Sequence, residues 1–296
     1  MLPNLIIAGA PKSGTTSLFH WLSDHPEVCA AARKELQFFM DEDSSVFRPK
    51  ENYHVNGIGQ YHSYFKHYDS HIHKLVIEAT PGYLYQKNAL ASIYKEIPNA
   101  HIIFIFREPS DRFRSIFNYF INNRSELDKK LTIQKFYELV KRKDPSLSNN
   151  EFLFNVLEHG HYINYLQPWV DTFSRENITI LIYDELIKNP KVALKKLSQK
   201  FSISHEFYDG YNFLQKNKTF HIKNQLLHKL AWKINIFFPE NIFRNKVKEL
   251  YFKINGENLN PKDDNQNSFL ELLRTNYKNS NQKLGELINT DLTKWE

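Results

Sequence analysis

The chain has 296 residues, 41% of them hydrophobic and 24% charged, a composition typical of a soluble globular protein. Its single cysteine, Cys29, excludes an intramolecular disulfide bond and favours a reducing compartment. No apolar run approaches the length of a membrane span, and the N-terminus lacks the charged region and small-residue cleavage site of a secretory signal. We therefore expect a cytoplasmic protein with no integral membrane segment.

The net charge of +6 and the sequence pI near 9.0 suit anionic ligands such as nucleotides, sulfated sugars or acidic lipids. Lys and Arg are spread along the chain rather than gathered in one block, so we expect no nucleic-acid partner. The oligomeric state stays unknown at this stage.

In chain order, short apolar runs alternate with segments of helical spacing. An apolar strand at residues 5–8 is followed by a Gly-containing turn and a helix at 16–23. Further strands are predicted at 75–77, 101–106 and 178–183, and further helices at 109–120, 133–140, 155–173 and 190–201. This alternation predicts the α/β class, with a mainly parallel central sheet flanked by helices.

The C-terminal third differs in composition. Residues 226–243 mix apolar and basic side chains, which is typical either of a helix packed on the sheet or of a helix on a membrane surface. Residues 255–267 are polar and predict a loop, and two short helices are expected to finish the chain. We expect one domain, residues 1–296, with a helical C-terminal subregion from about 221 to 296.

The turn after the first strand has the composition of a phosphate-binding loop. It reads Gly-Ala-Pro-Lys-Ser-Gly-Thr-Thr over residues 9–16 and leads into a helix N-terminus, where backbone N–H groups bind anions. In a nucleotide-triphosphatase loop, lysine directly follows the second glycine. Here Thr15 occupies that place, and Lys12 lies two residues before Gly14. A magnesium-dependent kinase stays possible, with Glu78 as the acid it would need.

Several motifs resemble those of sulfotransferases that use 3′-phosphoadenosine 5′-phosphosulfate (PAPS). Residues 11–18 look like the 5′-phosphosulfate loop, and residues 107–112 with Ser115 look like the 3′-phosphate motif R-[DE]-P-x-x-R followed by serine. Residues 34–39 (Lys-Glu-Leu-Gln-Phe-Phe) and 78–83 (Glu-Ala-Thr-Pro-Gly-Tyr) are similar to segments of the heparan-type and bacterial carbohydrate branch. The ending at 291–295 also resembles a frequent family ending. The resemblance implies a P-loop-like fold.

The resemblance also implies roles for individual residues. The donor PAPS would be bound by the loop residues Lys12, Ser13, Gly14, Thr15, Thr16 and Ser17 and by Arg107 and Ser115. Sulfuryl transfer builds negative charge on the leaving bridge oxygen, which Lys12 would neutralise. Arg107 and Ser115 would hold the 3′ phosphate, and no metal is needed.

Less specific positions complete the expected donor site. Lys218 and Phe220 match the family's C-terminal nucleotide loop loosely, with the lysine near phosphate and the phenyl ring near adenine. We expect Arg112 and Arg114 to face solvent or to pair with Asp111.

The acceptor must lose a proton as it attacks, and Glu35 holds the position of the base in the resembling branch. The histidines His62, His67 and His159 are alternatives, because other branches use histidine. A metal site could in principle be formed by His62, His67, His71, His73 and Asp69, but their spacing fits no metal-ligand pattern.

The segment around Glu35 favours a carbohydrate hydroxyl as acceptor, with a small natural product close behind and an amine possible. Ala79 replaces a lysine common in heparan-modifying members, which counts against a glycosaminoglycan acceptor. The rival interpretations are the kinase and a non-catalytic binder of anionic polymers.

Overall fold

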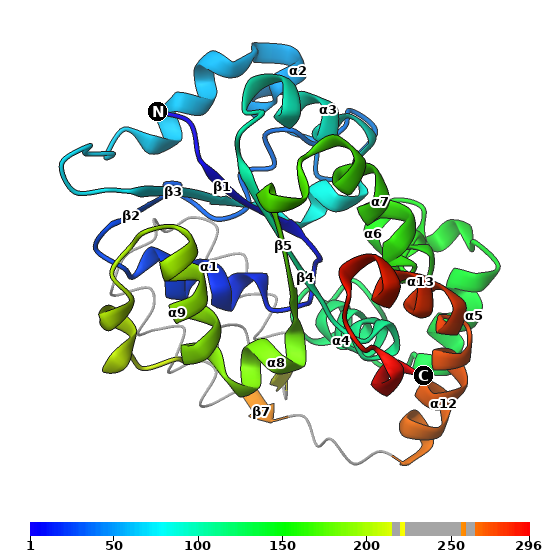
Figure 1. Ribbon diagram of the computed structural model, residues 1–296. Coiled ribbons are helices and arrows are strands. Elements are labelled where there is room, and N and C mark those ends of the chain that lie inside the picture. The colour runs from blue at the N-terminus through cyan, green and yellow to red at the C-terminus, as the bar shows by residue number, and fades with distance from the viewer. Residues whose placement is uncertain (215–219, 223–255, 259–263) are drawn as a thin grey trace.

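The computed structural model describes residues 1–214, 220–222, 256–258 and 264–296. Its core is a parallel sheet of five strands in the order β2-β3-β1-β4-β5 (Figure 1). The strands are β1 (Leu5–Gly9), β2 (Val28–Ala30), β3 (Leu75–Ala79), β4 (His101–Phe106) and β5 (Ile178–Ile182). The sequence predicts all of them except β2, whose three residues are too short to show a periodicity.

Helices cover both faces of this sheet, which confirms the predicted α/β class. The longer ones are α1 (Thr15–Ser23), α3 (Lys87–Glu96), α4 (Pro109–Asn122), α5 (Ile133–Lys141), α7 (Tyr162–Thr172), α8 (Tyr183–Lys188), α9 (Pro190–Lys200), α12 (Asp264–Thr275) and α13 (Lys278–Ile288). Shorter turns include α2 (Tyr53–Asn56), α6 (Glu151–Phe154), and the 3₁₀ segments η1 (Pro49–Glu51), η2 (Ile58–Phe65), η3 (Pro81–Tyr85), η4 (Pro145–Leu147), η5 (Glu158–Gly160) and η7 (His205–Asp209).

Alternate residues of the strands point to opposite faces and divide the core in two. Leu5 and Ile7 of β1 pack with the apolar side chains of α1, α8 and α9. Ile6 and Ala8 pack on the other face with α3, α7, α13 and the aromatic segment that follows β2. Figure 1 shows α1 and α9 on one side of the strands and α3 and α7 on the other.

A third apolar cluster lies apart from the sheet. It joins α4, α5 and α12 through Phe113, Phe136 and Leu273, and it extends to α6 through Leu153. The start of α4 follows β4, so this cluster adjoins the carboxyl edge of the sheet. That edge is where ligands bind in open α/β folds.

Two predicted elements in the C-terminal and central parts are wrong in detail. The helix predicted at 155–173 begins only at Tyr162, after η5, because the backbone of His161 is not helical (φ −82°, ψ 66°). Gly160 lies against Tyr277, and a Cβ there would be 2.5 Å from that ring. The loop predicted at 255–267 contains strand β7 (Gly256–Asn258), paired antiparallel with β6 (Phe220–Ile222), and the first residues of α12.

The predicted helix at 226–243 lies outside the described residues, and the single-domain assignment stays a prediction. The two short helices expected at the C-terminus are α12, which packs on α4, and α13, which packs on α7. Within the described part of the chain, no helix is both long and apolar enough to cross a bilayer.

Candidate active site

A cavity of about 1470 Å³ opens at the carboxyl edge of the sheet. Its walls come from the phosphate loop, the segment after β2, the ends of β3 and β4, and α4 to α6. A single small-molecule site usually occupies roughly 300–1,000 Å³, so this cavity has room for two ligands side by side.

The phosphate loop links β1 to α1 and has the conformation that its glycine allows. Gly14 has φ 91°, and a Cβ there would lie 3.0 Å from Cδ2 of Tyr183. Gly14, Thr15, Thr16 and Ser17 all line the cavity at the N-terminus of α1, which favours bound anions. The loop therefore lies as the sequence predicts.

Ser13 is placed differently from its neighbours in the loop. Its side chain is fully buried, and Ser13 is not among the residues that line the cavity. Its backbone N–H donates to the Ala10 carbonyl at 3.2 Å, so the structure does not bring Ser13 to the cavity with the other loop residues.

Lys12 lies at the centre of the cavity wall. Its ammonium nitrogen is 4.0 Å from the centre of the Tyr119 ring, a cation–π contact. Burial, with a smaller contribution from repulsion by Arg107, lowers the pKa of Lys12 from 10.5 to about 8, and Glu35 acts in the opposite direction. Lys12 therefore stays largely cationic at neutral pH while lying close to Arg107 and Glu35.

Arg107 directly follows β4 and lines the cavity. Its guanidinium carbon lies 4.6 Å from the centre of the Tyr183 ring, and its buried Nε has no hydrogen-bond partner in the described part of the chain. The Tyr162 hydroxyl donates to the Arg107 carbonyl at 2.9 Å, which fixes the backbone there. A buried donor without a partner is costly unless a ligand accepts from it, so Arg107 fits an anionic group of the donor.

A cap at the N-terminus of α4 fixes the backbone directly after Arg107. The buried Glu108 carboxylate caps the helix by accepting from the backbone N–H groups of Ser110 and Asp111, at 2.8 and 2.9 Å. Ser115 is half-buried and lines the cavity, and its predicted contact with the 3′ phosphate stays a prediction.

The prediction for Arg112 is wrong. Its side chain is only 1% exposed and its Nη2 donates to the Val156 carbonyl at 3.1 Å. Its guanidinium lies near the rings of Tyr85 and Tyr162, whose aromatic faces make this burial possible. Arg114 does pair with Asp111, at 2.5 Å.

Glu35 lies in the cavity wall opposite the loop. Its backbone N–H donates to the Ala79 carbonyl at 2.9 Å, which ties the segment after β2 to the end of β3. Its carboxylate accepts from the Lys34 ammonium at 2.5 Å, and about half of its side chain is exposed. Glu35 is therefore accessible to a ligand in the cavity and is held by a neighbouring cation.

Glu78, the acid that a kinase would need, is not among the residues that line the cavity. It is fully buried and accepts from the Thr80 hydroxyl at 2.5 Å. Burial raises the pKa of Glu78 from 4.5 to about 8, so the group is protonated at neutral pH. Because Glu78 does not face the cavity, it is not placed to hold a Mg²⁺ ion beside a nucleotide bound there.

The three candidate histidines are in different environments. His159 lines the cavity, stacked on Tyr85 at 3.8 Å, and burial lowers its pKa well below 6.5. His62 accepts from the N-terminal ammonium and His67 contacts the Ala30 carbonyl, so both are engaged elsewhere. Among the described residues, no three His, Cys, Asp or Glu side chains form a group that could hold a metal ion.

The predicted C-terminal nucleotide loop is described only in part. Lys218 lies outside the described residues. Phe220 begins strand β6, and this strand lies against α4, the helix that carries Ser115.

Two aromatic residues of the site were missed by the sequence analysis. Tyr119 lies four residues after Ser115, so helical periodicity places both on one face of α4. Tyr183 directly follows β5, at the edge where the strands end. Both signals were present in the sequence, but in a chain rich in aromatic residues they do not distinguish a site tyrosine from one that fills the core.

Comparison with known proteins agrees with this geometry. Residues 2–225 match the family model described as "Sulfotransferase domain". The chain belongs to the sulfotransferase family. The match spans the sheet, the phosphate loop and the α4 motif, and it confirms the family assigned by resemblance.

Relatives of this sulfotransferase-family chain include the membrane-associated sulfotransferase kil1 of Dictyostelium discoideum. It is 26% identical over an alignment that covers the whole chain and 67% of kil1. The heparan sulfate glucosamine 3-O-sulfotransferase 5 of Mus musculus is 30% identical over 68% of the chain and 53% of that protein. The chain thus spans about half to two-thirds of the length of these relatives.

A solved structure shows the same fold. The sulfotransferase from Alicyclobacillus acidocaldarius superposes with a TM-score of 0.69 at 21% identity, covering 100% of this chain and 99% of that one.

Proposed function

We propose that the protein transfers the sulfuryl group of PAPS to an acceptor hydroxyl and releases 3′-phosphoadenosine 5′-phosphate (PAP). The convergence of Lys12, Arg107 and Glu35 on one cavity carries this proposal. Two cations suit the two phosphate ends of the donor, and the accessible carboxylate suits proton removal from the acceptor.

The donor would lie along the phosphate loop and the start of α4. Backbone N–H groups at Gly14 to Thr16 would bind the 5′ phosphate, with the hydroxyls of Thr16 and Ser17 nearby. Arg107 and Ser115 would bind the 3′ phosphate, since the Arg107 Nε has no partner among the residues that the structure describes. Tyr183 would keep the guanidinium in place through its ring.

The transfer itself is a displacement at sulfur. The acceptor oxygen forms a bond to sulfur while the bond from sulfur to the bridging phosphate oxygen breaks, and that oxygen leaves with the electron pair. Lys12 would neutralise the leaving oxygen, and Glu35 would take the acceptor proton. An amine acceptor would follow the same course.

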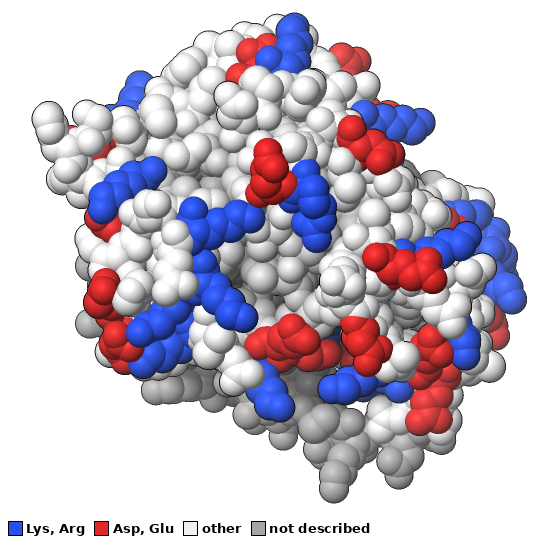
Figure 2. Space-filling view, in the orientation of Figure 1, with Lys and Arg blue, Asp and Glu red and all other residues white. Residues whose placement is uncertain are grey.

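Two observations bear on the rival functions. Glu78, the acid considered for a magnesium-dependent kinase, is buried and does not line the cavity, which disfavours that function. A non-catalytic binder of anionic polymers would need a continuous basic surface. Figure 2 instead shows Lys and Arg lying next to Asp and Glu on the face drawn there.

Titration calorimetry and a transfer assay test the proposal. PAP should bind with a micromolar or lower dissociation constant without magnesium, and ATP with magnesium should bind at least tenfold more weakly. Incubation with labelled PAPS and an alcohol should then yield labelled product. Preference for magnesium-ATP would favour the kinase, and PAP binding without turnover would favour the binder.

The acceptor would be a carbohydrate or a small natural product. The carbohydrate option is supported by relatives named for heparan sulfate. The cytoplasmic location stays a prediction.

A further inference from the structure

The cavity continues beyond the transfer site into a region lined by apolar side chains. Tyr119, which contacts Lys12, packs edge-on against Phe120, with ring centres 5.3 Å apart. From there the cavity is lined by the side chains that we call the apolar lobe: Phe120, Leu127, Leu131, Leu139, Leu147 and Phe152. The lobe therefore begins beside the reacting centre.

The apolar lobe is a formed part of the fold. Phe120, Leu127 and Leu147 are buried and belong to the cluster of α4, α5 and α6 that is separate from the sheet. Leu131 and Leu139 are half-buried, so part of their apolar surface faces the cavity. Covering such surface with an apolar ligand is favourable.

The charged groups around the lobe do not suit a polyanion. Arg124 pairs with Glu126 at 2.9 Å, and the second Glu126 oxygen accepts from Asn150 at 2.9 Å. Asp128 and Glu151 line the same part of the cavity. Carboxylates outnumber cations among these lining residues, so a sulfated or carboxylated chain would be repelled.

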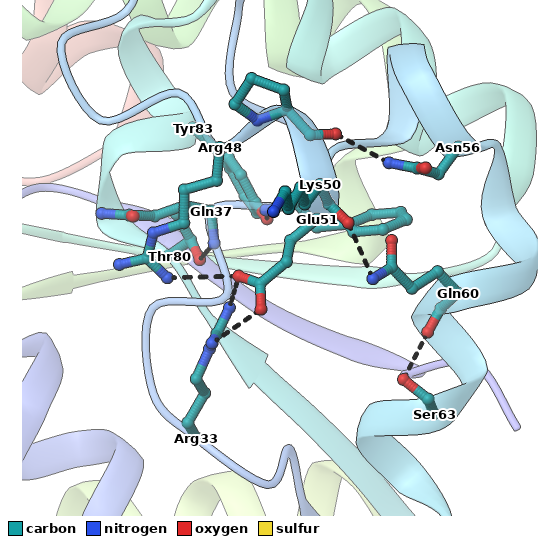
Figure 3. A network of polar contacts seen from close by, with 12 residues as sticks. Arg33, Gln37, Arg48, Lys50, Glu51, Asn56, Gln60, Ser63, Thr80 and Tyr83 are labelled. Carbon is teal, nitrogen blue, oxygen red and sulfur yellow. Dashed lines mark hydrogen bonds and ion pairs between the residues drawn. The ribbon is translucent and has the colours of Figure 1, made fainter.

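Two arginines on another wall of the cavity are already paired with a carboxylate of the protein. Arg33 and Arg48 both line the cavity, and Figure 3 shows Glu51 between them. Arg33 forms a two-point ion pair with Glu51, and Arg48 lies 3.7 Å from the same carboxylate. A polyanionic acceptor would therefore have to compete with Glu51 for both guanidinium groups.

We infer that the acceptor is an alcohol carried on an uncharged apolar body, and that this body occupies the apolar lobe. The inference rests on the proposed PAPS-dependent transfer and specifies its acceptor. The hydroxyl lies near Glu35 and Lys12, and the apolar body extends past Tyr119 toward Leu131. Apolar contact then replaces the ionic recognition that a glycosaminoglycan would require.

A chain-length series tests this assignment. Labelled PAPS is supplied with ethanol, butan-1-ol, hexan-1-ol, octan-1-ol or a heparan sulfate oligosaccharide, and initial rates give KM and kcat. KM should fall about three- to fourfold with each added methylene until the lobe is filled, as expected for transfer of CH₂ out of water. The oligosaccharide should have a lower kcat/KM than octan-1-ol.

Two leucine variants provide the matched control. Leu131→Ser removes apolar surface from the lobe and should raise KM for octan-1-ol about tenfold, with the dissociation constant of PAP unchanged. Leu90→Ser changes a leucine of similar burial on α3, outside the cavity, and should keep the wild-type chain-length dependence. Melting temperatures of both variants show whether each is folded.

The outcomes separate this inference from the proposed function. If KM does not depend on chain length, or if the oligosaccharide is preferred to every alcohol, the apolar acceptor is wrong although PAPS-dependent transfer stands. If no acceptor is labelled at all, the proposed function fails and this inference fails with it.

Discussion

The Lys12 ammonium lies 4.0 Å above the ring of Tyr119, and this contact joins the phosphate loop to the last turn of α4. The ring face stabilises the cation in a buried position and directs it toward the cavity. Tyr119 is therefore a positioning residue for Lys12.

Removing this ring should slow transfer. Tyr119→Leu is expected to lower kcat about five- to thirtyfold, the equivalent of the ~1–2 kcal/mol of a desolvated cation–π contact. Tyr119→Phe keeps the ring face and should retain most of kcat. Measuring kcat and PAP affinity for both variants checks this, because equal losses for Phe and Leu would assign the effect to the hydroxyl instead.

Lys12→Ala should reduce turnover more than donor affinity, because the cation is needed most as the bridge oxygen becomes anionic. In the wild type, kcat/KM for the donor should fall as the pH rises through about 8, where Lys12 loses its proton in the free enzyme. Lys12→Arg should move this limb to higher pH. A basic limb unchanged in Lys12→Arg would show that another group titrates there.

Arg107→Ala should weaken PAP binding far more than binding of adenosine 5′-phosphosulfate, which lacks the 3′ phosphate. Loss of a charge-assisted contact should cost about 2–3 kcal/mol, or roughly 30- to 150-fold in the dissociation constant. Arg114→Ala is the control, since Arg114 pairs with Asp111 and is not a cavity residue. Equal weakening of both nucleotides in Arg107→Ala would remove Arg107 from the 3′-phosphate role.

Glu35→Gln preserves the volume of the side chain but cannot accept a proton at neutral pH. Turnover with an alcohol acceptor should fall roughly 100- to 10,000-fold, while PAP affinity barely changes. The melting temperature controls for loosening of the segment tied to Ala79. Near-normal turnover in the folded variant would direct attention to His159, which also lines the cavity.

Glu78 should make stability depend on pH. Its pKa is raised in the folded protein to about 8, so its contribution is fully present below pH 4.5 and is lost as the pH rises to about 8. Glu78→Gln should remove this contribution to the pH dependence. Urea unfolding of both proteins at pH 5 and pH 8 measures it, and an identical pH dependence in the two would contradict the buried neutral state.

The residues proposed to contact the donor could be selected from the sequence because their signals are local. Each of these residues lies within a short motif whose residue types indicate its chemistry: the phosphate loop for Lys12, the end of a strand for Arg107 and the segment after β2 for Glu35. Arg112 could not be placed in this way, because its burial depends on Tyr85 and Tyr162 from two other elements. The apolar lobe was missed for the same reason, since its leucines come from separate helices and loops.

The separation of the apolar clusters has a consequence for how this protein can change. The phosphate loop and Arg107, which would hold the donor, adjoin the two apolar clusters that pack on the sheet. The apolar lobe belongs instead to the third cluster, which is formed by α4, α5 and α6. Substitutions at Leu131 or Leu139 can reshape the space for an acceptor without altering the apolar clusters that pack on the sheet, because neither leucine belongs to them. The specificity for the acceptor can therefore change during evolution while the proposed donor site stays the same.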